Sequence, residues 1–188
     1  MTAVAELYLS DVRGRMRGVK VLGDGALAQL GATDWHTPLA SGGNSAAVLV
    51  QHLAGNMHSR WAGLRGGYSA GTEGESAVRN RDAEFEEGEL NGATLLRRWE
   101  EGWQVFLDAL DHLTPGDLTR PLTIRGEVHT VLEAVQRQVA HYSGHVYQLI
   151  LLVKTLRGPA WQTLSIPRGG SAAYNSALLS ETAEPGAT

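Results

Sequence analysis

Apolar residues recur at intervals of three and four in four separate segments of the chain, which is the spacing of one face of an α-helix. These segments predict helices over residues 4–30, 44–65, 92–113 and 130–156. Asn44 or Ser45 is a suitable N-cap for the second helix, and Thr130 and Glu133 form a capping box at the start of the fourth. Four amphipathic helices of this length predict an all-α fold, an up-down four-helix bundle.

The same periodicity predicts which side chains fill the core. The expected interior positions are Val12, Met16, Val19, Leu53, Trp99, Trp103, Phe106, Val135, Val139 and Val146. A short β-hairpin is expected before the fourth helix, because Arg125-Gly126 can turn the chain between Leu122–Ile124 and Glu127–His129. We expect one domain over residues 1–176. It includes an extension after about residue 157 that shows no clear regular structure, and residues 177–188 form a flexible tail.

Composition narrows the classes of function. The chain has 188 residues, 43% of them hydrophobic, a net charge of −4 and no cysteine. The absence of a basic block argues against nucleic acid as the partner, and the absence of cysteine excludes disulfides and thiolate metal sites. No apolar run approaches the length of a membrane span, and the first residues do not resemble a signal peptide. We therefore expect a cytoplasmic protein with no membrane partner.

The histidines carry the candidate chemistry. His141 and His145 lie four apart in the fourth predicted helix, so their side chains stack on one face. Such a pair serves either packing or metal binding, and a metal needs a third ligand from a facing helix. His52 and His58 in the second helix are about 120° apart around its axis. We choose His52 as the third ligand because it lies nearer the apolar stripe of the helix. The alternative role for His52 is that of a histidine at the edge of the core, hydrogen-bonded to a neighbour.

Two segments, "VQHLAGNMHSRW" (50–61) and "QRQVAHYSGHVYQ" (136–148), resemble the DinB/YfiT-like superfamily of metalloenzymes over about residues 1–157. "RNRDAEF", "TVLEAV" and "LSIPRGGSAAYN" are similar to one uncharacterised branch of it. The resemblance implies a four-helix bundle that binds one divalent metal through His52, His141 and His145. Imidazole ligands suit zinc, nickel and iron, so the sequence does not choose the metal.

The resemblance also implies a metal-dependent transferase or isomerase that uses a low-molecular-weight thiol of the bacillithiol, mycothiol or glutathione type. A non-catalytic metal-binding or stress-associated protein and a metal-dependent hydrolase are the alternatives. No general base can be assigned, because Glu84, Glu86 and Glu87 lie in a loop. We expect a small-molecule substrate and a homodimer. Candidate substrate-binding residues are Trp61, Arg79, Arg81 and Arg168, and candidate supports of the ligands are Asn56, Gln138, Tyr142 and Gln148.

Overall fold

The computed structural model describes residues 2–63 and 79–182 of the protein. Its four long helices are α1 (Thr2–Leu27), α2 (Ala46–Trp61), α3 (Gly92–His112) and α4 (Val131–Arg157). The predicted all-α bundle is confirmed. α1 begins and ends earlier than expected, and α2 ends four residues early, at Trp61; residue 65 lies outside the described part of the chain.

The helix starts are set by side chains that satisfy free backbone N–H groups. Ser45, rather than Asn44, caps α2: its hydroxyl oxygen accepts a hydrogen bond from the backbone N–H of Val48. Asn91 caps α3 in the same way. At α4, Thr130 and Glu133 complete the reciprocal capping box that the sequence predicts. These caps fix the phase of α2 and α4, and therefore which side chains face each other.

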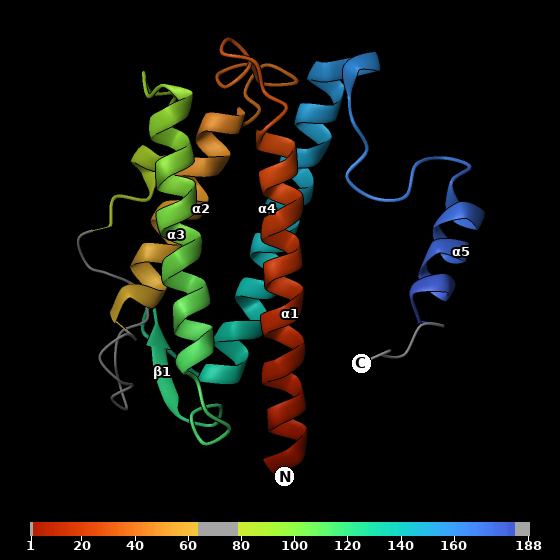
Figure 1. Cartoon of the computed structure of the whole chain (residues 1–188). Helices are drawn as coiled ribbons and strands as arrows, with labels where there is room; N and C mark the ends of the chain where they lie inside the picture. Colours follow the sequence, from red (N-terminus) through yellow and green to blue (C-terminus); the bar gives the residue numbers. More distant parts are fainter. Residues whose placement is uncertain (1, 64–78, 183–188) are drawn as a thin grey trace.

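The directions of the helices differ from a simple alternation. Figure 1 shows α1 and α4 running away from the end that carries the N-terminus, whereas α2 and α3 both run back toward it. Ala54 accordingly lies against Gly102, and further along both helices the rings of Trp61 and Phe106 are 5.2 Å apart. α3 begins at the same end of the bundle as α2, away from the N-terminus, so these neighbours are parallel (Figure 1). α2 and α4 remain antiparallel.

The expected hairpin is present as β1 (Pro121–Ile124) and β2 (Glu127–Thr130). Leu122 pairs with His129 in the antiparallel register. The turn needs positive φ at both central residues, with 55° at Arg125 and 79° at Gly126, which is the pattern of a tight two-residue hairpin turn. The hairpin leads directly into α4 and holds Arg125 at one end of the bundle.

The core follows the predicted seams. Eight of the ten expected interior residues are buried: Val12, Met16, Leu53, Trp99, Trp103, Phe106, Val135 and Val146. Val19 and Val139 are only partly buried and pack against the edge of this core. Within the described ranges, no helix is long and apolar enough to cross a membrane.

The C-terminal extension contains a helix that the sequence did not predict. α5 spans Ser171–Thr182, which includes residues expected in the flexible tail; residues 183–188 lie outside the described residues. Before it, the chain is tied to the residues directly after α1, because the backbone N–H of Gln162 donates to Oε1 of Gln29 at 2.8 Å. Figure 1 shows α5 standing apart from the bundle. Periodicity misses this helix since it is short and has little amphipathic character.

Candidate metal centre

His52 of α2 meets His141 and His145 of α4 in one cluster. The Nε2 atoms of His52 and His141 lie 3.1 Å apart. The ring centroid of His145 is 5.0 Å from that of His52 and 4.7 Å from that of His141. One nitrogen from each of the three residues lies within 4.8 Å of the other two. The structure therefore brings together the three histidines that the sequence singled out.

Helical phase explains which histidines join the cluster. His141 and His145 share a face of α4 because they are one turn apart. His52 is buried on the side of α2 that faces α4, whereas His58 is exposed on another face of the same helix. His36 and His112 are also exposed, outside the cluster.

The three imidazoles fit a divalent metal. Zinc–nitrogen bonds of about 2.0–2.1 Å in a tetrahedral site place ligand nitrogens about 3.3 Å apart. The separation of 3.1 Å between His52 and His141 is close to that value. Three neutral nitrogen donors suit zinc, nickel or iron, and they leave coordination positions open. The cluster can thus hold one metal ion with positions left for a small molecule.

Hydrogen bonds fix the outer nitrogens of two of the rings. Nδ1 of His52 lies 3.0 Å from Oε2 of Glu84, and Nδ1 of His145 lies 3.0 Å from Oε1 of Gln148. A carboxylate or amide oxygen accepts, so each Nδ1 carries the proton and each Nε2 is left with its lone pair. Nδ1 of His141 is buried and has no hydrogen-bond partner among the residues that the structure describes.

Glu84 is itself held in place. Arg79 donates to it twice, from Nε to Oε1 at 2.7 Å and from a terminal nitrogen to Oε2 at 2.6 Å. Burial alone would raise the pKa of the Glu84 carboxyl, but the hydrogen bonds from His52 and Arg79 and the positive charge of Arg79 lower it overall. The group is therefore an ionised carboxylate engaged on both oxygens, which suits it to orient His52 rather than to act as a general acid.

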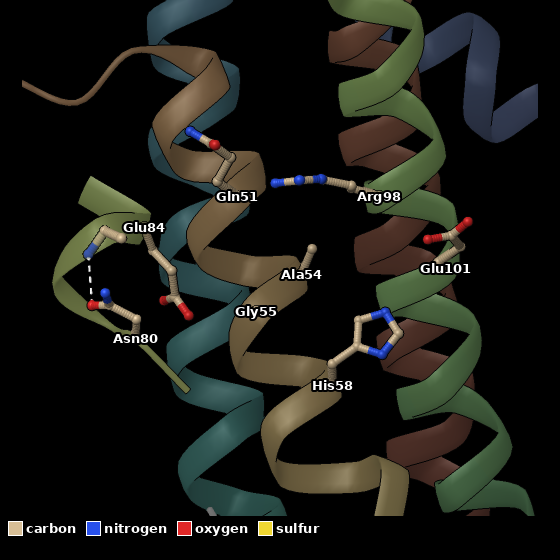
Figure 2. A pocket seen from close by; sticks show the side chains of 9 residues that line it. Gln51, Ala54, Gly55, His58, Asn80, Glu84, Arg98 and Glu101 are labelled. Atoms are coloured by element: carbon tan, nitrogen blue, oxygen red, sulfur yellow. Dashed lines mark hydrogen bonds between the residues drawn. The ribbon is translucent and has the colours of Figure 1, made fainter. Parts of the chain in front are cut away.

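The backbone beside Glu84 leaves room for this arrangement. Gly55 lies one turn after Gln51 on α2, and a β-carbon at this position would collide with the Glu84 carboxylate. Figure 2 shows the Glu84 side chain reaching toward the backbone of α2 at Gly55 from the turn that carries Asn80. Glycine at residue 55 is thus needed for the close approach of the carboxylate.

Burial keeps the ligands in the form that binds metal. It lowers the pKa of His141 to about 3, with the charges of His145 and His52 acting in the same direction. It also lowers the pKa of His145, although the hydrogen bond that His145 donates to Gln148 opposes the shift. A protonated imidazole cannot coordinate a metal. These rings are therefore neutral at physiological pH.

The segment "RNRDAEF" covers His52. Its 3₁₀ helix, η2 (Asp82–Phe85), places the Phe85 ring 4.5 Å from the His52 ring. The Arg81 guanidinium lies over the Phe85 ring, 4.8 Å from its centroid. The sequence indicates Arg79 and Arg81 in this segment as candidate substrate-binding residues, but it does not indicate that Glu84 orients a ligand. The only signal was the motif itself, because no periodicity places an irregular loop.

Two of the candidate supports, Asn56 and Tyr142, form a buried hydrogen-bonded chain with Trp61. The indole N–H of Trp61 donates to the Tyr142 hydroxyl at 3.0 Å, and that hydroxyl donates to Oδ1 of Asn56 at 2.9 Å. Burial raises the pKa of Tyr142, so it stays protonated. Trp61 is only 2% exposed. The core and this hydrogen bond hold the ring of Trp61, a candidate substrate-binding residue, inside the bundle.

The histidine cluster opens into a cavity of about 360 Å³. Its lining comprises His52, Asn56, Arg60, Arg79, Arg81, Phe85, Arg125, Arg137, Gln138, His141 and His145. Both candidate arginines of the loop are thus at the site, as is Gln138. Arg168 is exposed on the segment that precedes α5 and is not part of this lining.

A second cavity of about 350 Å³ lies on the other side of α2 (Figure 2). Its lining comprises Gln51, Ala54, Gly55, His58, Asn80, Ala83, Glu84, Arg98 and Glu101. Glu84 contributes to its wall while its carboxylate contacts His52. The carboxylate therefore separates the histidine cluster from this second cavity.

Comparison with known proteins gives a family but no activity. A search of curated proteins and a search of solved structures each returned no match. A family model described as "Protein of unknown function (DUF1572)" matches residues 3–170, which includes all four bundle helices and the three histidines. The chain is therefore a member of the DUF1572 family.

Proposed function

We propose that this protein is a metal-dependent enzyme of the DinB/YfiT-like kind that transfers a low-molecular-weight thiol to an electrophilic substrate. His52, His141 and His145 hold one divalent ion, which is zinc, nickel or iron. The resemblance of "VQHLAGNMHSRW" and "QRQVAHYSGHVYQ" to that superfamily supports this proposal. A cytoplasmic location and a homodimer belong to the same proposal.

The observation that carries the proposal is the convergence of three imidazoles at the floor of an open cavity. A purely structural zinc site fills four positions with protein ligands, whereas three ligands leave room for a reactant. Glu84 and Gln148 orient two of the rings through their outer nitrogens. The site is therefore preorganised and accessible, which is the arrangement that catalysis requires.

The residues of the chain have separable roles in this proposal. A divalent cation supplies positive charge that lowers the pKa of a thiol from about 8.5, so that the thiolate predominates at neutral pH. Glu84 and Arg79 hold His52, and Phe85 covers its ring and excludes water. Arg81 is at the cavity mouth, where it can bind the carboxylates of a thiol cosubstrate.

The test is to load the protein with cobalt and titrate it with bacillithiol, glutathione and cysteine while recording the absorption spectrum. We expect a sulfur-to-cobalt charge-transfer band with at least one thiol, absent from His52→Ala and retained in His58→Ala. His58 is the matched control because it lies on α2 but outside the cluster.

Other outcomes select the alternatives. Absence of the band with every thiol, together with hydrolysis of an ester or amide panel, would make the protein a metal-dependent hydrolase. Absence of both the band and any turnover would make it a non-catalytic metal-binding protein. A band that persists in His52→Ala would contradict the ligand assignment itself.

A further inference from the structure

The cavity above the histidines is strongly basic. Five arginines line it, and no aspartate or glutamate occurs in its lining among the described residues: the arginines are Arg60, Arg79, Arg81, Arg125 and Arg137. The chain as a whole has a net charge of −4. A cluster of positive side chains in a confined, partly apolar cavity produces a positive local potential, although the net charge of the chain is negative. Such a cavity attracts anions.

The arginines come from separate parts of the chain. Arg60 continues the stripe of His52 and Asn56 along α2, and Arg137 lies one turn before His141 on α4. Arg125 is at the turn of the hairpin, and Arg81 belongs to the loop before η2. Four segments of different structure thus direct guanidinium groups to one cavity, which the accidental spacing of a single helix does not explain.

The arginines divide into a buried pair and an exposed rim. Arg60 is 7% exposed, and the Arg79 side chain is 6% exposed and bonded to Glu84. Arg81, Arg125 and Arg137 are exposed. Arg137 makes no hydrogen bond or ion pair with any residue in the described ranges. The Asp82 carboxylate lies 3.9 Å from Arg81, and Asp82 is 97% exposed, so this pair is weak.

We propose that this cavity selects a substrate or cosubstrate with at least two negative charges, bound through the rim arginines Arg81, Arg125 and Arg137. The reacting end of the molecule lies toward His52, His141 and His145; that part of the inference rests on the proposed function. Guanidinium groups bind carboxylate and phosphate oxygens through paired hydrogen bonds, which gives orientation as well as affinity. A cavity of about 360 Å³ accommodates a small molecule of this class.

The test measures binding of probes that differ only in charge. Succinate, succinamate and succinamide have the same carbon skeleton with two, one and no negative charges, and glycerol phosphate is compared with glycerol for a phosphate group. Each is titrated calorimetrically into the full-length protein, both zinc-loaded and metal-free. We expect the dissociation constant to fall with each added charge in both forms. The stronger of succinate and glycerol phosphate identifies the preferred oxyanion.

Variants of Arg137 separate recognition from structure. Arg137→Gln should weaken binding of the preferred dianion by about tenfold or more, since it removes charge-assisted hydrogen bonds. Arg137→Lys, which keeps the charge but loses the planar fork, should be intermediate. Arg98→Gln is the control, because Arg98 lines the second cavity on the other side of α2. Metal content should be unchanged in all three variants.

Each outcome decides a different claim. Equal affinity for charged and neutral probes, no binding of either dianion, or an Arg137→Gln variant that binds like Arg98→Gln would overturn the inference. Preference for dianions in a protein that holds no metal would support the anion site and contradict the proposed function. Dianion binding that appears only with zinc and ignores Arg137 would assign the anion to the metal and not to the arginines.

Discussion

A substitution at Gly55 tests whether Glu84 positions a metal ligand. A methyl group at residue 55 would collide with the Glu84 carboxylate, which is the end of a flexible side chain and can move away. Gly55→Ala should therefore disturb the Glu84–His52 hydrogen bond with little cost to the fold. We expect zinc affinity to fall by about 10- to 100-fold, the usual effect of losing a group that orients a ligand.

The measurement is competition with a chromophoric zinc chelator. Gly14→Ala is the matched control, because a β-carbon at residue 14 of α1 meets no atom within 4 Å. Wild-type zinc affinity in Gly55→Ala, with the helix content of both variants unchanged, would show that Glu84 does not orient His52.

At this scale the sequence predicts regular positions and misses irregular ones. The choice of His52 over His58 follows from helical phase, and the structure places His52 beside His141 and His145. Glu84 reaches His52 from the short helix η2, 32 residues away in the sequence, and its position depends on Arg79 and on the space at Gly55. No local periodicity contains that information, so only the three-dimensional structure identifies it.

Among the elements, the turn after α3 should control acid stability. The Asp117 carboxylate accepts hydrogen bonds from the Thr114 hydroxyl at 2.6 Å and the Thr114 backbone N–H at 2.8 Å. The Thr114 hydroxyl bond lowers the pKa of Asp117, and burial only partly offsets this. A carboxyl whose pKa is lowered by folding stabilises the fold at pH values above its ordinary pKa of 3.8. That stabilisation is lost as the pH falls through the pKa of the folded state.

Asp117→Asn should therefore lower the free energy of unfolding by about 1 kcal/mol at neutral pH. The difference from wild type should vanish as the pH falls below 3.8. Urea unfolding at a series of pH values measures both quantities. Asp82→Asn is the control, since its side chain is 97% exposed. A deficit that is the same at every pH would mean that the loss does not arise from the ionised carboxylate.

The elements themselves were predicted unevenly. The capped helices α2, α3 and α4 were expected close to their observed ranges because the capping residues and the apolar stripe agree. The sequence does not predict that α2 and α3 run in the same direction, since periodicity gives no information on which end of the bundle a long connection reaches. η2 and α5 were missed because neither buries a side chain in the described residues, so no apolar pattern marks them.

For the whole molecule, α5 should be dispensable to the bundle. It stands apart from the four long helices in Figure 1, and Tyr174 and Leu178 on it are 48% and 44% exposed. The family match also ends at residue 170, directly before this helix. A chain that ends at Gly170 should keep the melting temperature and the metal content of the full chain. A fall of more than about 4 °C in the melting temperature, roughly 1 kcal/mol, would show that α5 stabilises the bundle.

A homodimer is the second expectation at this scale. Several large apolar side chains on α1 and α4 are exposed: Val4, Leu7, Val21, Tyr147 and Leu151. Apolar surface of this kind is typical of interfaces when it is contiguous. We expect light scattering to give twice the chain mass of 20.2 kDa. A mass of one chain across a wide range of concentration would contradict the dimer.

The proposed function depends on a metal ion that is held by three histidines from two helices. Elemental analysis of purified protein, dialysed against zinc and then against metal-free buffer, tests it most directly. His141→Ala should lose most of the metal while its circular dichroism stays helical, and the control His58→Ala should keep it. We expect about one zinc per chain in the wild type and in His58→Ala. Undiminished zinc in a folded His141→Ala variant would contradict it.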